Sequence, residues 1–92
     1  MTVIKVTQVM NGYELKEIAT VTMSDGFERL RRVFPSQVRA DEKRPVWIDL
    51  MSDDGQDLLD EQITITASQA KFLLKDFFKL PKKIWSKVRL EN

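Results

Sequence analysis

The sequence predicts an α+β fold: an antiparallel sheet of about five strands, arranged as two hairpins, then a C-terminal helix packed on one face. Three observations lead to this expectation. Apolar residues alternate along several segments, turn signals rich in Gly, Asn and Asp separate those segments, and a capped helical pattern follows them. Ninety-two residues, 42% of them hydrophobic, suffice for one small core. Residues 1–92 are therefore expected to form a single domain.

The first hairpin is predicted from two alternating segments, residues 2–10 and 13–23. Asn11-Gly12 lies between them, and this dipeptide accepts the positive φ angles of a two-residue hairpin turn. Strand, turn and strand is therefore the expected order for the first quarter of the chain.

Residues 27–34 fit either a strand or a helix. As a helix, the segment could be capped by Asp25 with Glu28 at the third helical position, and three apolar residues would share one face. A third strand is the preferred interpretation, because Pro35 leaves room for only two helical turns and the preceding hairpin needs a partner.

A second hairpin is expected after the polar loop at residues 36–45. Val46 to Met51 alternates as a strand, and Ser52-Asp53-Asp54-Gly55 forms a turn signal. Leu58 to Ile65 is predicted to return as the partner strand.

The C-terminal helix is expected to begin after Thr66, whose side chain can form a capping box with Gln69. Pro81 would break this helix, so it is expected to start a second short helix that ends at Arg89. The apolar arc predicted to pack on the sheet consists of Ala70, Leu73, Leu74, Phe77, Phe78 and Leu80.

Composition argues against catalysis. The chain has no cysteine, which removes cysteine nucleophiles and thiolate metal sites, and no histidine, which removes the commonest general base and the commonest metal ligand. The acidic run from Asp49 to Glu61 does not have the spacing of a calcium loop. We therefore expect no enzyme activity, cofactor, metal or small-molecule substrate. No apolar run approaches ~20 residues and no signal peptide is recognisable, so a cytoplasmic protein without membrane contact is expected.

Charge is strongly segregated along the chain. Six acids and no base lie between Asp49 and Glu61, so this segment carries −6 of a net charge of +1 and the remainder carries +7. Six lysines lie between Lys71 and Arg89, among large aromatic residues. Separated charges of this kind predict surfaces of opposite potential.

Two basic groups are the candidate binding sites for a partner or nucleic acid. The first holds Lys71, Phe72, Lys75, Lys79, Lys82 and Lys83. The second holds Arg29, Arg31, Arg32, Arg39, Lys43 and Arg44, of which the first three are the site candidates. Phe72 could pack within the fold, contact a partner, or stack on a base, and Trp85 could also stack on one. The arginines could bind phosphates or partner acids, or could instead pair with the chain's own acidic segment.

Residues 46–74 resemble the last hairpin and helix of the transcriptional positive-coactivator family of single-stranded DNA-binding proteins. The resemblance rests on Val46-Trp47-Ile48-Asp49-Leu50, the Asp53-Asp54-Gly55 turn, Ile63-Thr64-Ile65-Thr66 and the helix with Gln69. That family has a basic residue and a glycine before the last strand, where this chain has Glu61-Gln62. In its type alone, the chain is also similar to small phage-encoded accessory proteins, among them inhibitors of bacterial CRISPR systems.

These observations favour a non-catalytic, stoichiometric binding protein, encoded by a phage and acting in the host cytoplasm. It would dock on a host protein or ribonucleoprotein complex that handles nucleic acid, such as a CRISPR surveillance complex, near guide RNA or target DNA. The alternative is a protein that binds single-stranded DNA or RNA directly, with lysines and arginines on phosphates and an aromatic ring stacked on a base.

Overall fold

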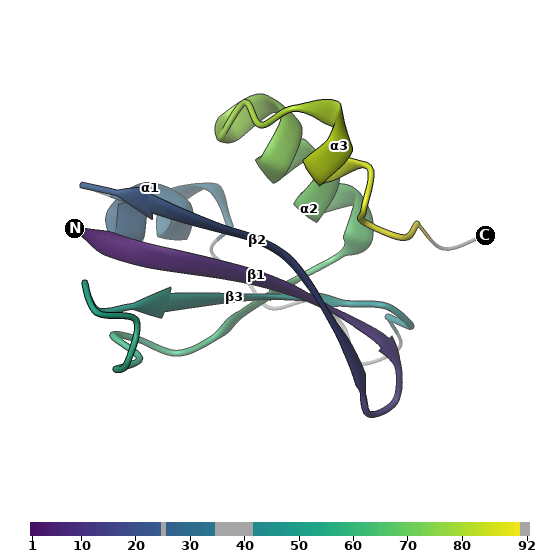
Figure 1. The fold of residues 1–92 in the computed structure, drawn as a ribbon, viewed down its shortest axis with the longest axis horizontal. Coiled ribbons are helices and arrows are strands. Elements are labelled where there is room, and N and C mark those ends of the chain that lie inside the picture. Colours follow the sequence, from purple (N-terminus) through teal and green to yellow (C-terminus); the bar gives the residue numbers. More distant parts are fainter. Residues whose placement is uncertain (25, 35–41, 91–92) are drawn as a thin grey trace.

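The computed structural model describes residues 1–24, 26–34 and 42–90, and for residues 26 and 27 the backbone alone. It contains a four-stranded antiparallel sheet in the order β2-β1-β3-β4, accompanied by short helices (Figure 1). The antiparallel sheet and the mixture of strands and helices agree with the predicted class. Within the described residues, four strands rather than five form the sheet.

The predicted first hairpin is confirmed. β1 (Thr2–Asn11) and β2 (Glu14–Met23) are antiparallel. The turn lies one residue later than predicted, because Asn11 belongs to β1 and pairs with Glu14, so that Gly12, with a φ of 61°, and Tyr13 form the turn. The register shifts between Val6 and Thr7, which face Ala19 and Glu17. Ile18 is thus an extra residue in β2, a β-bulge, and its side chain is buried.

The strand preferred for residues 27–34 is wrong, because Gly26–Val33 forms helix α1. A helix buries Leu30 and Phe34 together, since residues four apart lie on one helix face, and the Phe34 N–H donates to the Leu30 carbonyl at 2.8 Å. The free edge of β1 is occupied by β3, so the hairpin does not need this segment as a partner. The suggested cap, Asp25, lies outside the described residues.

The second strand pair is shorter than predicted. β3 (Val46–Met51) pairs with β1 and with β4 (Ile63–Ile65), both antiparallel. Leu58 forms only an isolated bridge to Met51, so residues 59–62 are not the continuous strand that was expected. Most of the predicted loop at 36–45 lies outside the described residues, and residues 42–45 are irregular.

The predicted capping box is confirmed at the start of α2 (Ala67–Phe72). The Gln69 N–H donates to Thr66 Oγ1 at 3.1 Å, and the Thr66 N–H donates to Gln69 Oε1 at 2.9 Å. A π-helical segment, η1 (Leu73–Phe77), continues directly from α2.

Helix α3 (Lys82–Trp85) begins after Pro81, which is its N-cap rather than its first helical residue, and α3 ends well before the predicted Arg89. Between the two helical segments, Lys79 has a φ of 55°, a left-handed conformation that ends the preceding helix. α3 then folds back along η1 (Figure 1).

One hydrophobic core joins the sheet and the helices. Alternate residues of β1 and β3 are buried, and they meet Ala70, Leu73 and Leu74 of the α2–η1 segment. Phe77, Phe78 and Leu80, predicted for the same arc, are only partly buried at the margin of this core. Within the described ranges, no helix is long and apolar enough to cross a membrane.

Candidate nucleic-acid interface

A surface hollow lies between α1 and η1, and we call it the arginine hollow. It has a volume of about 240 Å³ and is lined by Arg29, Arg32, Val33 and Phe77. The Arg29 guanidinium lies over the Phe77 ring, 4.9 Å from the ring centroid, which restricts where its donors can point. Arg32 follows three residues later on the same helix, and both side chains are exposed. Two guanidinium groups above an apolar floor suit a single anionic group.

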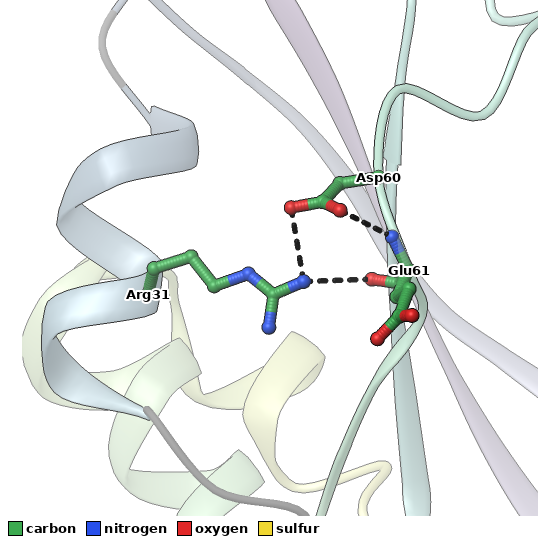
Figure 2. A network of polar contacts seen from close by, with 3 residues as sticks. All are labelled: Arg31, Asp60 and Glu61. Carbon is green, nitrogen blue, oxygen red and sulfur yellow. Dashed lines mark hydrogen bonds and ion pairs between the residues drawn. The ribbon is translucent and has the colours of Figure 1, made fainter.

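Arg31 is separated from the arginine hollow by its own contacts (Figure 2). Its Nη2 donates to the Asp60 carboxylate at 3.0 Å and to the Glu61 carbonyl at 3.4 Å. The alternative in which the arginines pair with the chain's own acidic segment is thus confirmed for Arg31. This residue anchors α1 to the segment that precedes β4, and its charge is already neutralised within the molecule.

Asp60 is stabilised as a carboxylate at this position. The Glu61 N–H donates to Asp60 Oδ1 at 2.7 Å, and this hydrogen bond, followed by the Arg31 contact, holds the pKa of Asp60 below its ordinary value. In the preceding turn, the Ser52 hydroxyl and the Gln56 N–H lower the pKa of Asp54 in the same way. Among the described residues, no group of three or more acids could hold a metal ion.

Two lysines of the first basic group converge on one aromatic ring. Lys71 Nζ lies 5.5 Å and Lys75 Nζ 5.3 Å from the centroid of the Trp85 ring. Like charges four residues apart on a helix repel each other, and the electron-rich ring face offsets this repulsion. Since both ammonium groups already lie over Trp85, this ring is a poor platform for a nucleobase.

Phe72 points away from the core, and half of its surface (50%) is exposed. Its packing within the fold, one of the alternatives left open by the sequence, is therefore incomplete. Lys75 lies one helical turn further along and is also exposed. Phe72 is the better placed of the two candidate stacking residues.

The remaining lysines lie at the far end of the helical segment. Lys79, Lys82 and Lys83 are all exposed, and no described residue forms an ion pair with any of them. They surround the turn at Pro81 rather than continuing the stripe of Lys71 and Lys75. The structure thus distributes the predicted site residues over five places: the arginine hollow, the Arg31–Asp60 pair, the Trp85 ring, the exposed ring of Phe72 and the Pro81 turn.

Sequence reasoning missed the apolar half of the arginine hollow. Phe77 was predicted to be a core residue, and Val33 was given no role. Val33 is 40% exposed at the end of α1. Once residues 26–33 are taken as a helix, Arg29, Arg32 and Val33 fall on neighbouring positions, so the helix interpretation would have suggested the cluster.

Comparison of this chain with protein-family models, curated proteins and solved structures found no match. The two resemblances suggested by the sequence therefore stay predictions.

Proposed function

We propose that this protein is a non-catalytic, stoichiometric binding protein that docks on a nucleic-acid-handling complex and blocks it. A CRISPR surveillance complex is the example that the sequence suggests. The arginine hollow carries the proposal, because it combines two exposed guanidinium groups with an apolar floor at a single concave place. Arginine with aromatic residues is the composition that contributes most to protein interfaces.

The size of the arginine hollow suits contact with one small anionic group of a partner. Pockets that enclose small-molecule ligands usually measure about 300–1,000 Å³, and this one is smaller and open. It suits one carboxylate side chain or one phosphate group, held by the planar donors of Arg29 and Arg32. Such a contact would position the protein on a larger surface.

The contacts made by the other cations support docking on a complex rather than binding along a single nucleic-acid strand. Proteins that follow single strands use a continuous positively charged groove. Here Arg31 is paired with Asp60, and Lys71 lies over Trp85, so the cations in the described part of the chain do not form one continuous row. The acidic segment before β4 gives the same molecule a second surface of opposite charge, suited to basic parts of a protein complex.

Purified protein can be mixed with purified CRISPR surveillance complexes of several types, and both complex formation and target-DNA cleavage measured. We expect a stable complex with at least one type and loss of cleavage at a one-to-one ratio. Arg32→Glu should weaken that complex by about tenfold or more, because it removes a charge-assisted contact and adds a like charge. Lys16→Glu makes the same charge change at an exposed residue of β2, outside the hollow and outside both basic groups, and should bind normally. Absence of binding and of inhibition for every complex tested would refute the proposal.

Direct binding of single-stranded nucleic acid is the second candidate, and the exposed ring of Phe72 favours it. In this case labelled single-stranded DNA or RNA should bind the isolated protein at low salt and dissociate steeply as salt rises, since neutralised phosphates release counterions. Phe72→Ala should cost about 1–3 kcal/mol of binding, the usual contribution of one stacked base. Oligonucleotides that fail to bind at low salt would exclude this candidate without affecting the first.

A further inference from the structure

Strand β2 has a free edge. It is the last strand in the sheet order and pairs on one side only, with β1. On the other side, no backbone hydrogen bond connects it to any residue that the structure describes. β2 lies at the outside of the sheet (Figure 1), so the backbone donors and acceptors on its outer side have no strand partner among the described residues.

The first half of this edge has the features by which proteins prevent strand pairing. Glu14, Lys16 and Glu17 are charged and exposed, and Ile18 forms the β-bulge. Lys16 also contacts the segment that follows α3, because its Nζ donates to the Lys87 carbonyl at 3.1 Å. An added strand would meet charges and an irregular backbone here.

The second half, Ala19 to Met23, has none of these features. It contains no charged residue, no proline and no glycine, and its sequence favours strands. Thr20 and Thr22 are exposed on the face of the sheet opposite the core, while Ala19, Val21 and Met23 pack against the core. The contrast between the two halves marks residues 19–23 as a segment that can accept another strand.

We propose that residues 19–23 pair antiparallel with the same residues of a second copy of this chain, about a two-fold axis at Val21. Opposite residues in an antiparallel pair lie on the same face of the sheet, whereas successive residues of one strand point to opposite faces. A two-fold axis that relates two copies of the same strand must therefore place one residue opposite its own copy. With the axis at Val21, Thr20 of each copy faces Thr22 of the other, and Ala19 faces Met23. Cross-strand threonine pairs are favourable, and no like charges meet.

The dimer would form a continuous eight-stranded sheet through a small interface. Five residues on each side bury much less than the ~800 Å² per partner of a standard stable interface. The association should therefore be weak and should depend strongly on concentration. It uses no residue of the arginine hollow, so its test is independent of the proposed function.

Sedimentation at increasing protein concentration tests the association. The average mass should rise from one copy toward two, and the double variant Thr20→Lys/Thr22→Lys should stay monomeric at every concentration. Both threonines are exposed, so the variant should keep its fold, which far-UV circular dichroism checks. Gln56→Lys/Ser68→Lys adds the same charge at exposed positions outside β2 and should still dimerise. An unmodified chain that is monomeric throughout, or a control that loses dimerisation as fully as the threonine variant, would overturn the proposal.

A single cysteine tests the register, because the chain has none of its own. On the axis, the two Val21 Cα atoms would be about 4.5–5.5 Å apart, a separation that a disulfide can span. Val21→Cys should therefore form a covalent dimer under mild oxidation. Thr20→Cys should not, because it faces Thr22 rather than itself. Crosslinking of Thr20→Cys in preference to Val21→Cys would overturn the pairing about Val21.

Discussion

The side chain of Gln8 and the backbone of Arg89 form a reciprocal pair of hydrogen bonds across 81 residues of sequence. Gln8 Nε2 donates to the Arg89 carbonyl at 2.8 Å, and the Arg89 N–H donates to Gln8 Oε1 at 2.8 Å. The same Nε2 donates to the Arg44 carbonyl at 3.2 Å. Gln8 is completely buried on β1, so one amide in the core connects the sheet, the start of β3 and the C-terminal segment.

Gln8→Leu should destabilise the protein although leucine is the more hydrophobic residue. The substitution leaves the N–H of Arg89 and the carbonyls of Arg44 and Arg89 without the amide, and an unsatisfied buried group costs about 1–3 kcal/mol. Chemical denaturation should show a loss of this size in the free energy of unfolding. Gln56→Leu, at an exposed position, should leave it almost unchanged. Equal stability of the two variants would contradict a structural role for the Gln8 amide.

Thr66→Ala should lower the free energy of unfolding by about 1 kcal/mol, the usual cost of losing an N-cap side chain. The substitution removes the acceptor of the Gln69 N–H at the start of α2. Ser68→Ala is the matched control, because Ser68 lies in the same helix, is exposed and takes no part in the capping box. Thermal or chemical denaturation of both variants measures the difference. A loss for Ser68→Ala as large as that for Thr66→Ala would show that the cap is not responsible.

The capping box and the first hairpin could be predicted from sequence because both depend on local chemistry. The hairpin needs only two alternating segments and the backbone freedom of Gly12 at its turn, and Thr66 needs only Gln69 three residues later. Whether residues 27–34 form a strand or a helix depends on a contact between segments that are distant in the sequence. β3 pairs with β1, so the first hairpin does not need a third strand from residues 27–34. Local patterns could not decide between the two structures.

The end of the second hairpin shows the same limit. Leu58 and Leu59 look like strand residues, yet they are 52% and 51% exposed. The chain before β4 is instead held by polar contacts, including that of Arg31 with Asp60, and these depend on where α1 lies. Lys71 and Lys75 lie over Trp85 because α3 packs against η1. The periodicity of the sequence does not predict that packing.

The Asp60 carboxylate should titrate below its ordinary pKa in the folded protein, chiefly because it accepts from the Glu61 N–H and secondly from Arg31. A folded pKa below the unfolded one means that this group adds stability above the unfolded pKa and loses it as pH falls through the folded pKa. An NMR titration of the side-chain carboxyl should give the low midpoint. Arg31→Met should raise the midpoint only part of the way, because the backbone hydrogen bond remains. Full return to the ordinary pKa would show that Arg31, rather than the Glu61 N–H, is the main cause.

Lys79→Gly should stabilise the protein, although Lys79 was predicted as a site residue. With a φ of 55°, Lys79 is the only non-glycine residue with a positive φ in the described part of the chain, and a β-carbon there costs about 1–2 kcal/mol. Glycine removes that cost but gains freedom in the unfolded chain, so a net increase of up to about 1 kcal/mol in the free energy of unfolding is expected. Lys79→Ala removes the same charge and keeps the β-carbon, so it should give no such increase. Chemical denaturation of the two variants separates the backbone effect from the charge effect, and equal stabilities would assign any change to the loss of the lysine.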